Sequence, residues 1–300
     1  MFTNCSKIDS IIDMYIKKTL YGASNMKKLS IPMLSAIAGA TAALSLVLRI
    51  ICLFFFYDDI GYYKSNAPLP IIANILLLLA IVFFIIATIF SISKKQSVEP
   101  TSKLSQYAAL LPMGALIFHV MRIFTGAFND TVVNKYLMAI SAILAAIFFF
   151  LIFYASKKTK TVAVYFGIGA ILYVFFCWML VYFDFYVPIN STAKTFFYVS
   201  CAGAALFIFG EICACYGWVR AKLYYFSLFS AIAVLSVSSV SAIIGYATGI
   251  LTSLISLEAD IFMTTLLVFA IARLIDAQKS TVAADAAPEE VKESTADDNE

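Results

Sequence analysis

Eight long apolar runs place the strongest constraint on how this chain folds. They occupy residues 31–57, 69–93, 105–126, 137–155, 161–183, 195–217, 224–248 and 254–275. Each is long enough to cross the hydrocarbon core of a bilayer, which takes roughly 20 helical residues. Because lipid offers no partner to a free backbone amide or carbonyl, each run must pair these groups within a helix. The sequence therefore predicts an all-α polytopic membrane bundle of about eight transmembrane helices, with the lipid bilayer as its main partner.

The composition agrees with a lipid environment. Of the 300 residues, 62% are hydrophobic and 13% are charged, whereas a soluble domain has roughly 25% charged residues. Two polar segments flank the transmembrane domain of residues 31–276. In residues 1–30, the spacing of Ile8, Ile12 and Tyr15 predicts an amphipathic helix. Residues 277–300 hold seven acidic residues and two lysines, and we expect them to form a disordered tail because they have almost nothing to bury.

The distribution of Lys and Arg predicts the orientation. Sixteen of the 21 basic residues fall in the N-terminal segment, the second, fourth and sixth connections, and the C-terminal end. Three fall in the first, third, fifth and seventh connections, and two lie within the runs. Connections rich in Lys and Arg stay in the cytoplasm. We therefore expect four hairpins that enter from the cytoplasm, both termini on the cytoplasmic side, and a location in the plasma membrane.

Ionisable residues within the runs are the candidates for function, since each costs about 2.5 to 3.5 kcal/mol to insert. Arg49 and Arg122 lie about two turns from the outer ends of the first and third runs, and His119 is one turn below Arg122. Glu258 and Asp260 lie at a similar depth in the last run. We predict that these five residues form an outward-facing polar pocket whose guanidinium groups bind an anionic small molecule. The alternatives are arginines that snorkel to the outer headgroups and ion pairs that only fix the order of the helices.

Glu211 lies apart from this group, six residues before the inner end of the sixth run. It is a candidate coupling carboxylate for a proton or a cation. The alternative is a structural role, in which it reaches Arg220 or the inner interface. The single histidine and the scattered cysteines have no metal-ligand spacing, so we expect neither a metal nor another cofactor.

Two further patterns concern how the runs pack. Val-x-Arg-Ile occurs at residues 47–50 and again at 120–123, which favours a duplicated hairpin with Arg49 and Arg122 at equivalent positions. Small residues recur every four positions at Ser35, Gly39 and Ala43, and again from Ser241 to Gly249. This spacing predicts close contacts between helices.

These features favour some functional classes over others. The chain has no nucleotide-binding loop, zinc-protease motif or serine-hydrolase motif, so we do not expect an enzyme. Its net charge of +3 comes from residues in short loops, where it sets topology and does not indicate nucleic-acid binding. The leading hypothesis is a small-molecule carrier or permease that uses the outer pocket. The alternative is a non-transporting receptor, assembly factor or accessory subunit, which needs a packed bundle but no polar binding cavity.

Overall fold

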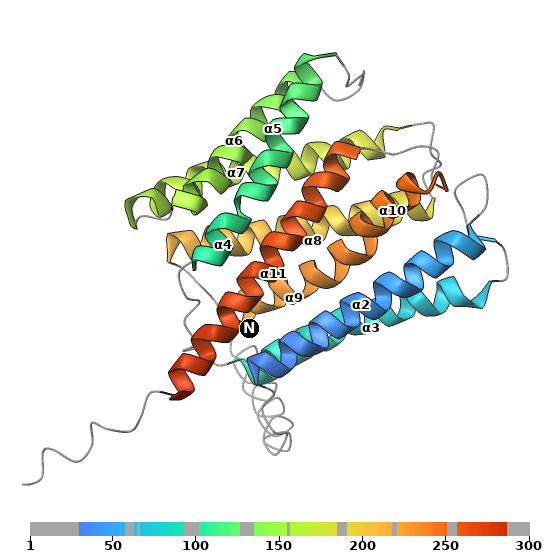
Figure 1. Ribbon diagram of the computed structural model, residues 1–300, viewed down its shortest axis with the longest axis horizontal. Coiled ribbons are helices and arrows are strands. Elements are labelled where there is room, and N and C mark those ends of the chain that lie inside the picture. The colour runs from blue at the N-terminus through green and yellow to red at the C-terminus, as the bar shows by residue number, and fades with distance from the viewer. Residues whose placement is uncertain are drawn as a thin grey trace, which may run out of the picture.

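The computed structural model describes residues 30–57, 63–64, 67–92, 102–126, 135–154, 157–184, 191–217, 221–250 and 257–286. In these ranges the regular structure is helical, apart from an isolated bridge between Tyr57 and Tyr63. With the labels of Figure 1, the helices are α2 (Ile31–Phe56), α3 (Pro68–Ser91), α4 (Lys103–Ala108), α5 (Leu110–Phe124), α6 (Lys135–Tyr154), α7 (Lys157–Tyr182), α8 (Thr192–Tyr216), α9 (Ala221–Leu235), the π-helical η2 (Ser236–Val240), α10 (Ser241–Ala247) and α11 (Leu257–Ala286). The predicted amphipathic helix near the N-terminus lies outside the described residues.

The helices follow the predicted runs closely. In the described part of the chain, seven helices are long and apolar enough to cross a membrane, counting α4 with α5 and counting α9, η2 and α10 together. The remaining one, α11, matches the last predicted run and carries more charged residues than any other span. The prediction of an all-helical membrane protein is therefore confirmed. The cytoplasmic or external side of each connection stays a prediction.

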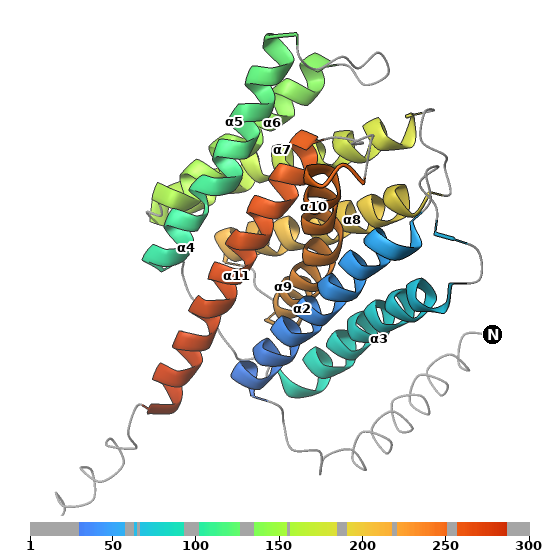
Figure 2. The same ribbon diagram turned by 45° about the vertical axis from the view of Figure 1, so that its right-hand side comes forward.

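The most charged helix, α11, lies in the middle of the bundle. It packs against α4 and α5, and also against α2, α9 and η2. Figures 1 and 2 show the α2–α3 hairpin and the group α5–α7 on opposite sides of it. By contrast, the highly apolar α3 has only 22% of its span buried within the protein. The bundle thus turns apolar helices toward lipid and encloses the helix whose charges need partners.

α11 also extends further than the sequence predicts. It continues to Ala286, so the first ten residues of the expected tail, from Ala277 onward, are helical. Just before this extension, the Asp276 carboxylate accepts hydrogen bonds from the backbone amide (3.1 Å) and the hydroxyl of Ser102. Ser102 in turn caps α4 by accepting from the Leu104 amide. Residues 287–300 lie outside the described part of the chain.

Helix starts and breaks follow local chemistry. Pro32 and Pro68 stand in the first turns of α2 and α3, where a missing amide hydrogen costs nothing. The Ser191 side chain accepts from the Lys194 amide and caps α8, which ends at Gly217 with φ of 79°. Within the third span the helix is interrupted at Ala109. Pro112 follows three residues later and cannot donate a backbone hydrogen bond, which favours a break at this point.

Glycines permit close approach at positions that the sequence pattern does not select. A Cβ atom added at Gly169 of α7 would lie 2.3 Å from the Cβ of Leu144 on α6, and one at Gly210 of α8 would lie 2.8 Å from the hydroxyl of Ser227 on α9. The same atom at Gly39 would meet nothing within 4 Å. The small-residue spacing in the first run therefore does not put Gly39 in a tight contact, because a repeat of small residues does not reveal which face meets a neighbour.

Candidate functional site

Arg122 and Glu258 join α5 to α11 in the outer half of the bundle. We use "outer half" for the part near the C-terminal ends of α2 and α5 and the N-terminal ends of α8 and α11, and "inner half" for the opposite part. The Arg122 Nε donates to a Glu258 carboxylate oxygen at 2.8 Å. The arginine side chain is 39% exposed and the glutamate side chain is 5% exposed. Glu258 also lies in the first turn of α11, where the helix dipole favours a negative charge.

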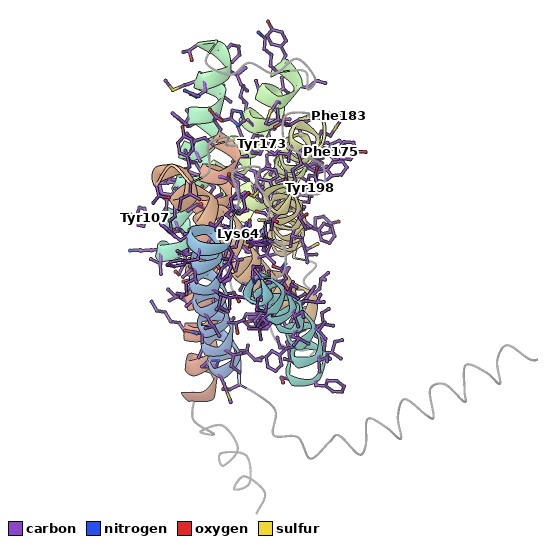
Figure 3. All side chains as sticks on the ribbon, turned by 90° about the vertical axis from the view of Figure 1, so that its right-hand side faces the viewer. Lys64, Tyr107, Tyr173, Phe175, Phe183 and Tyr198 are labelled. Atoms are coloured by element: carbon purple, nitrogen blue, oxygen red, sulfur yellow. The ribbon has the colours of Figure 1, made fainter. Side chains whose placement is uncertain are left out.

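His119 continues this polar group into the interior. It is fully buried, and its Nδ1 shares a hydrogen bond of 2.7 Å with the hydroxyl of Tyr173 on α7. Tyr173 is also hydrogen-bonded to the Cys177 side chain and packs edge-on against Phe262 of α11, with ring centroids 5.0 Å apart. Figure 3 shows Tyr173 inside the bundle, whereas Phe175 points outward. Tyr173 could not be predicted as part of this group, because an aromatic residue inside an apolar run ordinarily serves packing.

Asp260 is a second buried carboxylate near the start of α11. It is 4% exposed, and among the described residues no hydrogen bond or ion pair reaches its carboxylate. It interacts electrostatically with the thiols of Cys177 on α7 and Cys201 on α8. One turn further along α11, the buried hydroxyl of Thr264 has no hydrogen-bond partner either. A bare carboxylate is costly in this environment, so the position calls for a proton, a cation or a polar ligand.

Arg49 contacts aromatic rings, and among the described residues no ion pair joins it to Glu258 or Asp260. Its guanidinium lies over the rings of Phe196 on α8, at 4.1 Å from the ring centroid, and of Tyr63, at 5.1 Å. α2 and α5 lie on opposite sides of α11 (Figure 2). The two arginines thus contact different partners among the described residues, and a single pocket that contains both of them stays a prediction. Equal depth in the membrane was the basis of that expectation, and depth does not fix the position of a helix around the bundle axis.

Buried hydroxyl groups lie within and next to the π-helical segment in the same outer half. η2 packs against α2, α8 and α11. In the seventh span, Ser236 and Ser239 donate to carbonyl groups of their own helix at 2.9 and 2.7 Å, respectively. The hydroxyl groups of Ser238 in η2 and Ser200 in α8 are buried and have no hydrogen-bond partner. We name Asp260, Thr264, Ser238 and Ser200 the outer polar set.

Glu211 belongs to a separate, fully paired cluster in the inner half. One carboxylate oxygen accepts from Arg273 Nε at 2.9 Å and from the Tyr224 hydroxyl at 2.6 Å. Its partner is thus Arg273 of α11, which the sequence pattern places at the inner end of the last run among the cytoplasmic charges. The Arg273 guanidinium also lies over the Tyr224 ring, 5.7 Å from its centroid. Because its charge is paired with Arg273 and the same oxygen accepts from Tyr224, Glu211 is placed to hold α8, α9 and α11 together.

Comparisons with known proteins add no assignment. The chain matches no protein-family model, no curated protein and no solved structure. Within the ranges that the structure describes, no three His, Cys, Asp or Glu side chains gather closely enough to hold a metal ion.

Proposed function

We propose that the protein is a carrier for a small polar solute, which binds in the outer half of the bundle between α2, α8, η2 and α11. The observation that carries this proposal is the outer polar set. Its four side chains are on helices that pack against one another, and they lack the partners that polar groups inside a membrane protein normally have. An unpaired buried hydroxyl or carboxylate destabilises the fold. A bundle that only needed to pack would place apolar residues at these positions.

The four side chains also share a depth. Asp260 and Thr264 are three and seven residues from the start of α11, Ser200 is eight residues from the start of α8, and Ser238 is nine residues from the end of α10. At about 1.5 Å per helical residue, they lie about 5 to 14 Å from the outer helix ends. This is roughly the outer third to half of a 30 Å hydrocarbon core. A solute that enters from outside would meet them before the midplane.

The π-helical segment supports a carrier for a second reason. π-helical turns inside α-helices are uncommon and often occur at functional sites, because the wider turn disturbs the regular backbone hydrogen bonds. Carriers frequently use interrupted helices to present backbone and side-chain polar groups to a substrate. Here the interruption lies in a highly buried span, 78% of which is enclosed by the protein. Ser238 lies in the middle of the interruption.

Within this proposal, Asp260 takes the coupling role for which the sequence makes Glu211 a candidate. Glu211 is paired with Arg273, so its charge is already compensated. Asp260 has no such partner among the described residues and can exchange a proton or a cation during transport. Thr264 and Ser200 provide hydroxyl groups that can both donate to and accept from a polar solute.

The proposal is tested with the purified full-length protein and with proteoliposomes. A panel of amino acids, sugars, nucleosides and small organic acids is screened for compounds that raise the thermal unfolding temperature, and each hit is then assayed for uptake. We expect hits to stabilise and accumulate with the wild type and with Asp276→Asn, but not with Asp260→Asn. Asp276→Asn is the matched control, because it makes the same change on the same helix in the inner half. A compound that binds through Asp260 yet never crosses the membrane would favour a receptor instead.

A further inference from the structure

Arg49 is a buried cation with an unused hydrogen-bonding edge. It is 5% exposed, and its Nε and Nη1 groups make no hydrogen bond. No carboxylate of the described residues forms an ion pair with it. The Phe196 and Tyr63 rings lie against the guanidinium. An arginine stacked on aromatic rings keeps its in-plane N–H groups available and binds carboxylate or phosphate oxygens through two parallel hydrogen bonds.

Two other arginines of the same bundle form ion pairs with carboxylates, as expected of a cation with a structural role. Arg122 has a carboxylate oxygen at 2.8 Å and Arg273 has one at 2.9 Å. Arg122 also lies at the position of the repeated Val-x-Arg-Ile pattern that corresponds to Arg49. Snorkelling does not explain Arg49 either, because a snorkelling side chain keeps its charged end in contact with water or headgroups. Arg49 is enclosed, so its compensating charge must come from elsewhere.

Ser200 supplies a second donor beside Arg49. Phe196, which contacts the guanidinium, is one helical turn before Ser200 on α8, so the two side chains share a face of that helix. The Ser200 hydroxyl is buried and unpartnered. α8 and α2 both pack against η2, which brings in the unpartnered hydroxyl of Ser238. One cation and two hydroxyl groups thus border the same region between α2, α8 and η2.

We infer that Arg49, with Ser200 and Ser238, forms a binding site for an oxyanion, either a carboxylate or a phosphate group. This inference rests on the proposed carrier function and names the class of its solute as a small organic or inorganic anion. Arg49 binds the anionic group, while Asp260 on α11 exchanges the accompanying proton or cation. The Arg122–Glu258 pair stays intact and takes no part in binding.

The experiment measures anion-dependent thermal stabilisation of the full-length protein in an uncharged detergent. Potassium phosphate, acetate and succinate are titrated against potassium chloride at equal ionic strength and pH. We expect at least one oxyanion to stabilise the wild type and Arg122→Gln equally. Arg49→Gln should weaken that binding at least tenfold, and Ser200→Ala should weaken it by a smaller factor. If Arg49→Gln folds poorly, Arg49→Lys is used instead, because lysine keeps the charge but cannot make two parallel hydrogen bonds. This variant should fold and bind the oxyanion more weakly than the wild type.

Further experiments distinguish three possible counter-ions of Arg49: a free anion, a lipid phosphate and a carboxylate of the chain itself. If phosphatidylglycerol but no free oxyanion stabilises the protein through Arg49, the site holds a lipid phosphate and the assignment of an anionic solute is overturned. Asp58 and Asp59 follow α2 in the sequence. If their double replacement by Asn lowers stability as much as Arg49→Gln, and free oxyanions have no effect, the chain supplies its own counter-ion and the site is refuted. Arg49-dependent binding without transport refutes the carrier alone, and transport of a neutral solute independent of Arg49 refutes only the anion site.

Discussion

The inner cluster of Glu211, Arg273 and Tyr224 gives a sharp test of how burial sets the strength of an ion pair. Arg273→Met removes the cation and leaves Glu211, which is 2% exposed, without a compensating charge. Breaking a buried pair in this way costs about 3 to 5 kcal/mol. Replacing Glu211 by Leu and Arg273 by Met together removes both charges, and we expect the double variant to recover most of that loss. Tyr224→Phe deletes only the 2.6 Å hydrogen bond and should cost about 1 kcal/mol.

The outer pair provides the matched comparison at almost the same distance. Arg122 and Glu258 are 2.8 Å apart, but the arginine side chain is 39% exposed. Water and headgroups can therefore solvate the charges when the pair is broken, and Arg122→Met should cost about 1 kcal/mol or less. The free energy of unfolding is measured for each variant by denaturation in mixed micelles, and the double-mutant coupling energy is calculated for both pairs.

The expected result is a large coupling energy for Glu211–Arg273 and a small one for Arg122–Glu258. Two outcomes would refute the reasoning. In the first, both pairs give the same coupling energy, so that distance rather than burial decides. In the second, the inner double variant is as unstable as Arg273→Met alone, so that the loss comes from packing of the long side chains and not from the isolated carboxylate.

Three further results are expected. Gly169→Ala should destabilise the protein by about 1 to 3 kcal/mol through the clash with Leu144, whereas Gly39→Ala, with open space around it, should be neutral or slightly stabilising in the same unfolding assay. Ser102→Ala removes both the cap of α4 and the partner of Asp276, and should lower stability by about 0.5 to 2 kcal/mol; no change would mean that the cap is replaced by water. Reporter fusions after residues 96, 159 and 221 should read cytoplasmic and those near 65, 132, 190 and 251 external; an external signal at 159 would contradict the eight-span topology.

The depth of the charged side chains along their helices could be predicted from the sequence, whereas the neighbours they face could not, and the polar pocket itself stays a prediction. Five charged residues were expected within the membrane because they lie inside apolar runs: Arg49, Arg122, Glu258, Asp260 and Glu211. All five are buried or partly buried within the bundle. Depth along a helix follows from counting residues, because each adds a fixed rise. It carries no information on which neighbour a side chain faces, and for that reason Arg49 was grouped with Arg122 although α11 lies between their helices.

The uncharged residues that bind these ionisable side chains could not be predicted from the sequence, for a related reason. Tyr173 and Tyr224 resemble packing residues in the sequence, and only the fold brings their hydroxyl groups to His119 and Glu211. Arg273 stands near the inner end of its run, so the sequence groups it with the basic residues of the C-terminal end. The structure encloses it instead, since α11 is surrounded by other helices and continues beyond it.

The sequence by itself determined the all-helical class of the protein and the approximate position of its long apolar helices, although not the extension of α11 to Ala286. The physical reason is that each segment in a bilayer must meet the same requirements by itself. It must be long, apolar and internally hydrogen-bonded, whatever its neighbours are. Only the tertiary structure decided that α11 is central, that Glu211 pairs with Arg273, and that Arg49 and Asp260 remain without an ion pair in the described part of the chain. These outcomes depend on contacts between helices distant in sequence, and packing in lipid is set by small differences in side-chain fit that no single segment contains.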